Sequence, residues 1–550
     1  MRKEEIRNNE KMVYGTNPLT KMDYPDPDVI RVDDTYYMVS TTMHFYPGCE
    51  ILRSYDLINW EHYTYVYESI EGTAAQKLEN DLSGDSCGEN DNQKVYKHIY
   101  GQGMWAPCIR YHEGKFYIVF SCNDTKKTYV YTSSDLRGPW TMGTIEGFYH
   151  DSSLLFDEGN VYIVYGNTDI HLTQLKADLS GPLEGGIDRI IIRDIDNPNL
   201  GYEGSHIYKI DGRYYVFLIH SLKEEWRRVE AVFSADSLMG EFEGGDILDD
   251  DLGYRNSGIA QGGMVDDGNG NYYIILFQDS GAVGRIPHLV PFEFIDGKVV
   301  VPGGKVPAKL ETIDIRNTDL SEGVSGENAT KSYEPLMSND DFSYLDKLER
   351  NKYNDRLYGC FGLKSCWQFS HEPDLSLISV NDGKLSIKTD RLSVNLFYAK
   401  NTLTQRMVYP SCEASVVLDG SKLNDGDYAG LCAYQGNYAF AGIMKRDGKL
   451  YAVMCDYYNT GDAWKFDDKE CIIREEVELD KEEVLVRCET VFANEKDECV
   501  FYVDGKKIGE KHKLEFRLDH FTGVRYGLFV YSTKCVGGSA LFSDFKIGGV

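Results

Sequence analysis

Hydrophobic and polar positions alternate in a unit that occurs five times in the first half of the chain. Each copy has a short apolar run, an acidic or glycine-containing turn and an aromatic strand. The copies are PDVIRVDDTYYMVST, APCIRYHEGKFYIVFS, SSLLFDEGNVYIVYG, GSHIYKIDGRYYVFLI and GGMVDDGNGNYYIILF. Asp, Gly and Asn between runs rich in Ile, Val, Tyr and Phe are typical of β-hairpins.

The regular recurrence of these hairpins indicates an array of β-units. A hairpin cannot bury both of its faces alone, and radial stacking of small antiparallel sheets does so while protecting the sheet edges. Two further strand-like runs around Asp296-Gly297 would complete the last unit. The pattern therefore predicts a five-bladed β-propeller.

A second domain is predicted after the propeller. The periodicity fails after Gly303 and gives way to a polar, loop-like stretch. Short strands then return with Asp-Gly turns, which is typical of a β-sandwich. We expect an all-β protein with a catalytic propeller at 1–303, a linker at 304–339 and a C-terminal sandwich at 340–550, and no long helix.

Composition limits the partners and the compartment. The chain has 88 acidic and 58 basic residues and a net charge of −30, which disfavours nucleic acid and anionic membranes and favours a neutral partner such as a sugar. The N-terminus lacks a signal-peptide core, and no apolar run is long enough for a membrane span. The 13 cysteines form no C-x-x-C pair. We expect a soluble cytoplasmic protein with reduced thiols and neither zinc nor a disulfide framework.

One residue opens each hairpin, about ten or eleven positions before its aromatic strand. These residues are Asp26, Trp105, Asp151, Glu203 and Gln261. Equal phase in equivalent repeats predicts that the five side chains surround one axis. Three are carboxylates, which raise one another's pKa and cost stability when clustered, so a function is more probable than a structural role.

Three of these residues also have a structural interpretation, whereas Glu203 has no turn propensity to explain its position. The two aspartates could be turn residues, and Trp105 could belong to the core. Three carboxylates could also bind a metal ion, but no calcium-loop motif is present. Cleavage of a sugar fits better, because one carboxylic acid can protonate the leaving oxygen while a second carboxylate activates water. Trp105 would then offer a flat wall to a pyranose ring.

Several motifs resemble glycoside hydrolase family 43, the β-xylosidases and α-L-arabinofuranosidases. They are the first hairpin with its flanks (NPLTKMDYPDPDVIRV), GMWAPCIRYHEGKFYIVFS, YHDSSLLFD and YEGSHIYKIDGRYYVF. Near the C-terminus, AKNTLTQRM and HFTGVRYGLF resemble the sandwich of the β-xylosidase branch. In that branch the sandwich is a wall that narrows the pocket; the alternative is an independent carbohydrate-binding module.

The resemblance implies catalytic roles for three residues. Asp26 would be the general base, Glu203 the general acid, and Asp151 the residue that tunes the acid by raising its pKa. Because the family inverts configuration, Asp26 and Glu203 should lie about 6.5–9.5 Å apart.

Further positions carry over as substrate-binding candidates. Arg285 matches a substrate-contacting arginine, Phe521 a sandwich phenylalanine that reaches over the site, and His44 a residue of the sugar pocket; a salt bridge or core packing would explain them equally simply. Many relatives have histidine where this chain has Gln261. That difference disfavours a tightly held central calcium, and we expect no required cofactor.

The sequence thus predicts an exo-acting, inverting hydrolase that releases terminal xylose from β-1,4-xylo-oligosaccharides, with α-L-arabinofuranose as a second candidate product. An arabinofuranosidase and a non-catalytic sugar-binding propeller remain alternatives. A retaining fructan hydrolase is disfavoured because its N-D-P-N-G and R-D-P motifs are absent from the propeller half. We expect an oligosaccharide as the partner, and leave open whether the chain forms a homo-oligomer.

Overall fold

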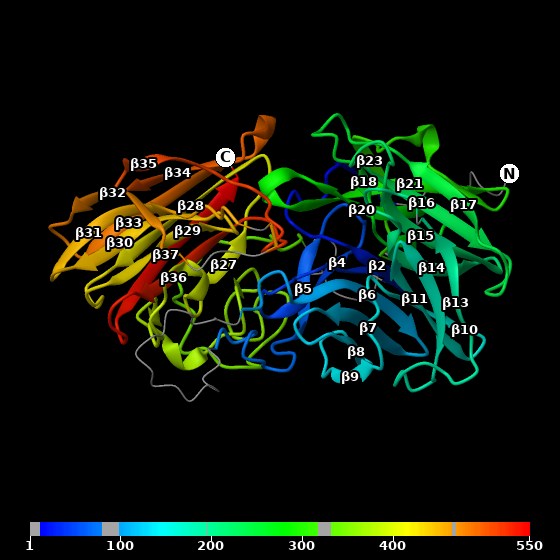
Figure 1. Cartoon of the computed structure of the whole chain (residues 1–550), viewed down its shortest axis with the longest axis horizontal. Helices are drawn as coiled ribbons and strands as arrows, with labels where there is room; N and C mark the ends of the chain where they lie inside the picture. Colours follow the sequence, from blue (N-terminus) through cyan, green and yellow to red (C-terminus); the bar gives the residue numbers. More distant parts are fainter. Residues whose placement is uncertain are drawn as a thin grey trace.

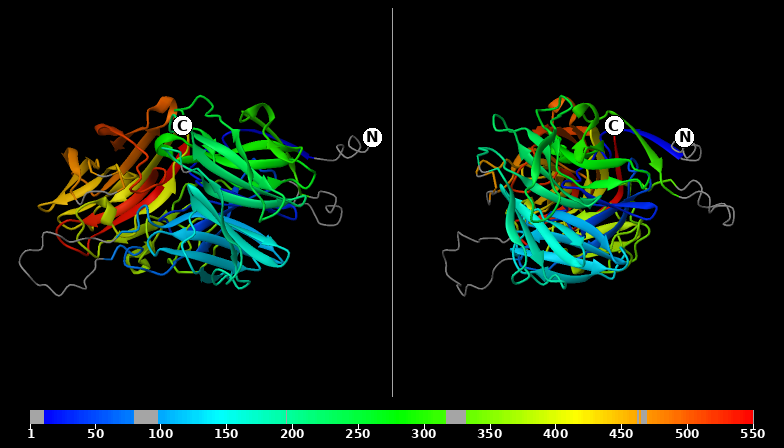
Figure 2. Two further views of the ribbon diagram at one scale, coloured as in Figure 1. Left: turned by 45° about the vertical axis from the view of Figure 1, so that its right-hand side comes forward. Right: turned by 90° about the vertical axis from the view of Figure 1, so that its right-hand side faces the viewer.

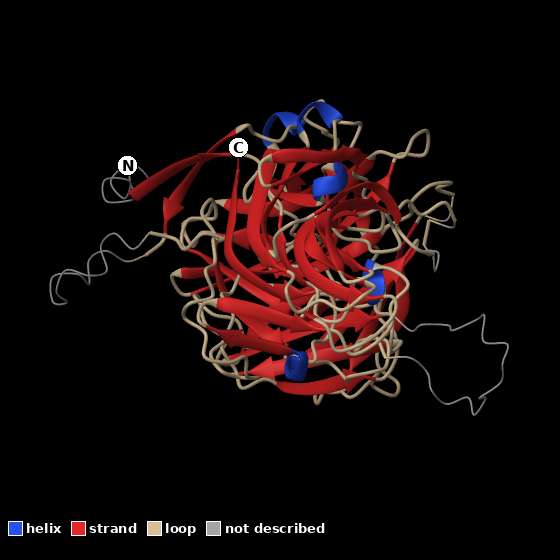
Figure 3. Cartoon of the chain, turned by 90° about the vertical axis from the view of Figure 1, so that its left-hand side faces the viewer, coloured by secondary structure: helices blue, strands red, loops and turns tan. Residues whose placement is uncertain are grey.

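The computed structural model contains two β-rich bodies that lie side by side (Figures 1 and 2). It describes residues 11–79, 98–194, 196–316, 332–461, 463–464 and 469–549. Within these ranges, strands dominate and helical structure is limited to single turns of 3₁₀-helix (Figure 3). The expected all-β fold is confirmed. No described helix has the length and apolar character needed to cross a membrane.

The first body is the predicted five-bladed propeller. Blades 1 to 4 are antiparallel sheets of four consecutive strands, and blade 5 contains the next five strands. Blade 1 has β2 (Asp28–Val32), β3 (Thr35–Val39), β4 (Gly48–Ser54) and β5 (Glu61–Tyr67). Blade 2 has β6 (Met104–His112), β7 (Lys115–Cys122), β8 (Lys127–Ser133) and β9 (Thr141–Ile145). Blade 3 has β10 (Ser153–Asp157), β11 (Asn160–Asn167), β12 (Asp169–Leu175) and β13 (Asp188–Arg193).

Blades 4 and 5 continue the same order around the axis. Blade 4 has β14 (Glu203–Ile210), β15 (Arg213–Ser221), β16 (Arg228–Ala235) and β17 (Glu243–Leu248). Blade 5 has β18 (Ile259–Ala260), β19 (Met264–Asp266), β20 (Tyr272–Asp279), β21 (Arg285–Ile295) and β22 (Lys298–Val300). The last two strands meet at Asp296-Gly297, both with positive φ, as the turn composition predicted.

The second body is a sandwich of two seven-stranded antiparallel sheets. One sheet has the order β24 (Gln368–Phe369), β27 (Leu403–Arg406), β36 (Arg525–Ser532), β29 (Asp427–Tyr434), β30 (Ala439–Arg446), β31 (Lys449–Asp456) and β32 (Ile472–Glu478). The other has β25 (Ile378–Asn381), β26 (Lys384–Lys388), β37 (Ser539–Gly549), β28 (Ser411–Asp419), β33 (Glu483–Val491), β34 (Glu498–Val503) and β35 (Lys506–Lys513). Alternating buried and exposed positions along β28 and β33 place one face of that sheet in the core.

The segment between the two bodies has an element that the sequence pattern did not indicate. β1 (Lys11–Thr16) pairs antiparallel with β23 (Lys309–Asp314). The pair joins the beginning of the described chain to the segment after the propeller. Much of the expected linker, residues 317–331, lies outside the described residues.

A buried carboxylate connects the inner strands of the propeller. Asp28 of blade 1 accepts hydrogen bonds from the backbone N–H of Ile109 (2.8 Å) and from Arg110 Nη1 (2.7 Å) of blade 2. Arg110 Nη2 donates to Ser153 Oγ of blade 3 (2.6 Å), and that oxygen accepts from the N–H of Ile207 of blade 4 (3.1 Å). Burial raises the pKa of Asp28, but Arg110 and His206 lower it well below its usual value overall. The charged carboxylate therefore holds several blades in register.

We predict that Asp28→Ala destabilises the propeller by about 3–5 kcal/mol, because it leaves the Arg110 guanidinium buried without its partner. Urea unfolding at pH 7 measures the change. Glu478→Gln is the matched control: Glu478 forms an exposed pair with Lys449 (2.9 Å), and such pairs contribute about 0–1 kcal/mol. Equal stability of the two variants would contradict a central role for Asp28.

Candidate active site

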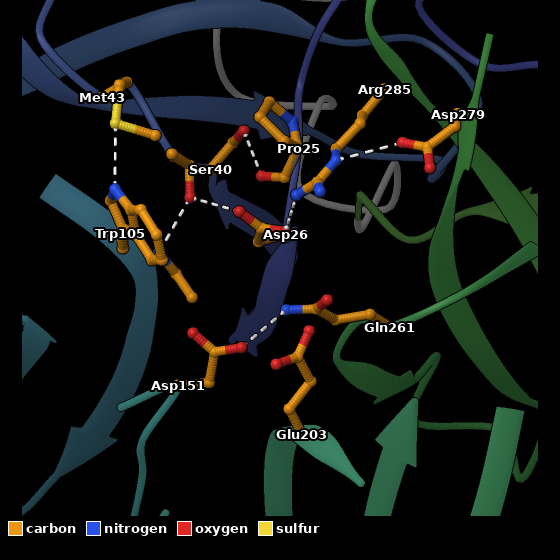
Figure 4. Close-up of polar contacts among 12 residues, drawn as sticks. Pro25, Asp26, Ser40, Met43, Trp105, Asp151, Glu203, Gln261, Asp279 and Arg285 are labelled. Carbon is orange, nitrogen blue, oxygen red and sulfur yellow. Dashed lines mark hydrogen bonds and ion pairs between the residues drawn. The ribbon is translucent and has the colours of Figure 1, made fainter. Parts of the chain in front are cut away.

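The three carboxylates that share a phase in the sequence converge at the start of the inner strands (Figure 4). Asp26 precedes β2, Asp151 precedes β10, and Glu203 is the first residue of β14. Asp26, Asp151 and Gln261 line one narrow cavity together with Ser152 and Ser205. The repeat phase therefore brought together residues from blades 1, 3, 4 and 5. Their catalytic roles stay predictions.

The backbone at these positions repeats more strictly than the side chains do. Asp26, Asp151 and Gln261 have φ of 51°, 46° and 61°, a region that non-glycine residues rarely adopt. The positions of the same kind in blades 2 and 4 are Ala106 (37°) and Gly204 (66°). Trp105 and Glu203 thus lie one residue earlier than the strict repeat. Such strain persists where the surrounding structure enforces it, and it concentrates at functional sites.

Asp26 is held by two donors from different parts of the propeller. Its Oδ2 accepts from Thr41 Oγ1 (2.6 Å), and its Oδ1 pairs with Arg285 Nη1 (2.9 Å). The carboxylate is 7% exposed, and the N–H of Ala106 donates to Thr41 Oγ1 (2.8 Å). A carboxylate fixed in this way is oriented, as a base that accepts a proton from water must be.

Arg285 is the centre of a buried charge network rather than a surface residue. Its Nε donates to Asp279 Oδ1 (3.1 Å), and Asp279 also pairs with Arg228. The guanidinium of Arg285 lies 4.6 Å from the ring centroids of both Phe277 and Phe521. These contacts restrict it to one position beside Asp26.

Glu203 has two donors on a single oxygen. Asn167 Nδ2 donates to Glu203 Oε2 (2.5 Å), and His150 Nε2 lies 3.4 Å from the same atom. His150 Nε2 is also 3.6 Å from Asp151 Oδ2. The imidazole therefore lies between two of the three carboxyl groups.

The expectation that Asp151 keeps Glu203 protonated stays a prediction, because the two buried carboxyl groups share one imidazole. Burial raises the pKa of Asp151 to about 7, with Glu203 and Asp26 adding to the effect of burial and His150 opposing it. Burial also raises the pKa of Glu203, but the hydrogen bond and charge of His150, with Arg228 and Arg285, lower it overall. The two groups titrate as a unit.

Gln261 joins the cluster through its side chain and its backbone. Its Nε2 donates to Asp151 Oδ2 at 3.5 Å, and its N–H donates to Glu230 Oε2 at 2.8 Å. Glu230 is fully buried, and burial raises the pKa of its carboxyl well above the usual value. A neutral Glu230 therefore supports the strained backbone of Gln261.

The sandwich contributes one wall of the site. Phe521 stacks on Trp105 with ring centroids 5.3 Å apart, and Trp105 Nε1 donates to Met43 Sδ at 3.0 Å. Asp23 fixes the loop that carries Phe521, because its carboxylate accepts from the N–H of Arg285 and from the N–H of Gly523, both at 2.8 Å. The expected aromatic wall is therefore made by two domains.

His44 is not brought to the carboxyl cluster. Its side chain is fully buried, with the ring centroid 4.4 Å from Phe45, 5.0 Å from Tyr100 and 5.5 Å from His520. Burial lowers the pKa of His44 well below its usual value, so the ring is neutral. The structure thus places it in packing between the two domains, next to Met43.

Sequence reasoning missed five polar residues that hold the cluster: Thr41, His150, Asn167, Arg228 and Asp279. None of the five is one of the repeated hairpin-opening residues, so the phase of the hairpins did not select them. The sequence could have indicated His150, because this residue directly precedes Asp151.

A metal ion at the cluster would compete with a proton. One ligand atom each of His150, Asp151 and Glu203 lies within 4.8 Å of the others, a spacing that metal ligands can have. Burial lowers the pKa of His150, but Asp151 and Glu203 raise it overall to about 9. A metal ion would have to displace the imidazole proton, and calcium would need six to eight oxygens. The expectation that no cofactor is required stays a prediction.

A propeller whose inner strands bring three carboxyl groups to one site fits enzymes that cleave glycosidic bonds with a pair of carboxyl groups. The family model described as glycosyl hydrolases family 43 matches residues 15–299, and the one described as a beta xylosidase C-terminal concanavalin A-like domain matches residues 362–547. The chain belongs to glycosyl hydrolase family 43, and it is a glycoside hydrolase.

Relatives whose names state an activity have a lower sequence identity to this chain than one of the solved structures has. A beta-xylosidase of Formosa agariphila is 24% identical over 479 residues, covering 78% of this chain and 74% of the relative. A xylosidase/arabinosidase of Butyrivibrio fibrisolvens is 27% identical, and the match covers 62% of this chain and 67% of the relative. Among solved structures, the bifunctional GH43-CE protein of Bacteroides eggerthii is 37% identical with a TM-score of 0.82, and the match covers 98% of this chain and 64% of that one.

We predict that Asp151→Asn stabilises the protein at alkaline pH. An unfolded aspartate titrates near pH 3.9, so between about pH 4 and 7 the folded state holds a proton that the unfolded state has lost. Wild-type stability therefore falls as pH rises through this range, and asparagine removes the loss. At pH 8 the variant should be more stable by on the order of 1 kcal/mol or more.

Urea unfolding at pH 5 and pH 8 measures this effect, since the advantage of the variant should grow between the two values. An advantage that shrinks from pH 5 to pH 8 would show that Asp151 is not the group with the raised pKa.

Proposed function

We propose that this chain is an exo-acting, inverting hydrolase that removes terminal xylose from β-1,4-xylo-oligosaccharides and also releases terminal α-L-arabinofuranose. The observation that carries the proposal is the asymmetry of the cluster. Asp26 is fixed by an arginine and a threonine, whereas Glu203 shares a histidine with Asp151. One side of the site is equipped to accept a proton and the other to supply one.

The roles of the side chains follow from this asymmetry. Asp26 would take a proton from the water that attacks the anomeric carbon, while Glu203 protonates the departing glycosidic oxygen. Trp105 and Phe521 would flank the sugar ring, and Arg285 would orient Asp26 and donate to a sugar hydroxyl. All of these steps use side chains, so the proposal includes no metal.

The choice of sugar rests on the relatives. Proteins named beta-xylosidase and xylosidase/arabinosidase match most of this chain, and a shorter match of 36% of the chain is to a non-reducing end alpha-L-arabinofuranosidase of Bacteroides ovatus. Both sugars are neutral, which fits a protein with a net charge of −30.

We also propose a cytoplasmic location. The twelve described cysteines are free thiols, most of them buried, and such thiols persist in a reducing compartment.

The substrate is tested by kcat/KM for xylobiose, an aryl β-xyloside and an aryl α-L-arabinofuranoside. We expect turnover of all three, with proton NMR showing that xylobiose first releases the α-anomer of xylose. Release of the β-anomer would contradict inversion. Turnover of the arabinofuranoside without xylobiose would make the protein an arabinofuranosidase.

The acid and base roles are separated by the leaving group. We predict that Glu203→Gln lowers kcat/KM on xylobiose by about 10²–10⁴-fold but has a much smaller effect on 2,4-dinitrophenyl β-xyloside, whose leaving group departs without a proton. Asp26→Asn should reduce both reactions strongly, because each needs the activated water. Similar losses for both variants on both substrates would reject the assignment.

A further inference from the structure

We propose that His150 is a positioning residue that transfers a proton to Glu203, so that Asp151, His150 and Glu203 form one relay for the acid. This proposal rests on the function proposed above. It addresses a conflict within the site: the acid must hold a proton, yet its surroundings favour its ionised form.

The geometry fits a relay. A single atom, His150 Nε2, lies 3.4 Å from Glu203 Oε2 and 3.6 Å from Asp151 Oδ2. The ring edge faces Trp105, whose centroid is 6.0 Å away, and this contact helps to orient the imidazole. Nε2 is already hydrogen-bonded to Glu203, and a small rotation of the ring would bring it within hydrogen-bond distance of Asp151.

Exposure provides the route to solvent. The His150 side chain is 23% exposed, compared with 18% for Glu203 and 8% for Asp151. The histidine is therefore the most accessible of the three groups.

Charges from other elements favour a protonated ring. Asp151 precedes β10, Glu203 begins β14 and Asp26 precedes β2, and all three raise the pKa of His150. Arg228 and Arg285 act on Glu203 from blades 4 and 5 and favour its ionised form. With the pKa of His150 near 9 and that of Asp151 near 7, protons are stored beside the acid at neutral pH.

The transfer balances as follows. The Nε2–H bond of the imidazolium breaks and an O–H bond forms on Glu203, leaving a neutral imidazole. Glu203 then gives this proton to the glycosidic oxygen as the bond to the anomeric carbon breaks. The carboxyl proton of Asp151 restores the imidazolium, and the proton that Asp26 took from water returns through solvent to Asp151. No other reactant is needed.

The test compares two substrates in His150→Gln. The glutamine amide can still donate a hydrogen bond, but it cannot transfer a proton at neutral pH. We expect kcat on xylobiose to fall by about tenfold or more, within the contribution of a positioned general acid. The rate on 2,4-dinitrophenyl β-xyloside, which needs no proton, should change less than about threefold. Equal losses on the two substrates would mean that His150 only supports the local structure.

Chemical rescue provides a second readout. In His150→Ala, added imidazole should restore part of kcat on xylobiose and leave the dinitrophenyl reaction unchanged. The absence of rescue together with equal losses in the glutamine variant would overturn the relay. His112→Gln is the matched control, because His112 is a half-exposed histidine at the far end of β6 that stacks on Phe156 (4.4 Å).

The outcomes distinguish this inference from the proposed function. If the wild-type enzyme cleaves arabinofuranosides but not xylobiose, the sugar assignment fails and the same comparison can be made with arabinofuranosides whose leaving groups differ. If the wild-type enzyme cleaves xylobiose and both histidine variants match it, the relay alone fails.

Discussion

The structure depends on charge buried near the axis of the propeller. Five inner strands converge there, and backbone groups that lack ladder partners must find others. Asp28 meets this need because one carboxylate accepts from blade 2 and, through Arg110 and Ser153, is connected to blades 3 and 4. Tyr208 extends the network, donating to Asp28 Oδ1 (3.4 Å) and accepting from the N–H of Met264 in blade 5 (3.0 Å). This framework supports the carboxyl cluster, since Asp26 lies two residues before Asp28 in the chain.

The same arrangement explains how several carboxyl groups share a small volume. Each acidic group is matched to a specific cation or remains neutral. Asp26 faces Arg285, Glu203 faces His150, and burial makes Asp151 and Glu230 the groups that hold protons. Net charge in the site is thus limited by proton uptake as well as by ion pairs. A site of this kind responds to pH as a unit.

The sequence was most informative where the physics is local and repeated. Asp-Gly turns and aromatic strands determine hairpins, and hairpins of similar spacing determine the propeller, so the blades and the positions of Asp26, Asp151 and Glu203 could be predicted. The pairing of β1 with β23 could not, because it joins segments far apart in the chain by backbone bonds alone. The pKa order of Asp151 and Glu203 was likewise inaccessible. It depends on how the imidazole of His150 and the guanidinium groups of Arg228 and Arg285 lie around the two carboxyl groups, and only the folded chain determines that placement. His44 shows a different limit of sequence reasoning. The sequence made it a candidate residue of the sugar pocket, but the side chains of Tyr100 and His520 pack around it.

The close packing of Gly523 against the propeller has a wider consequence. A Cβ at this position would come within 2.2 Å of the carbonyl oxygen of Val283, so the sandwich loop approaches the propeller backbone more closely than any other residue type would allow. Phe521 lies two residues before Gly523 in the same loop, and it contacts both Trp105 and Arg285. The pocket beside the carboxyl cluster is therefore completed only when the domains dock, so the same contacts shape the domain interface and the pocket. A mutation far from the carboxyl cluster can then alter the shape of the pocket if it changes how the sandwich packs on the propeller. Substrate range could change by this route while the carboxyl groups stay the same.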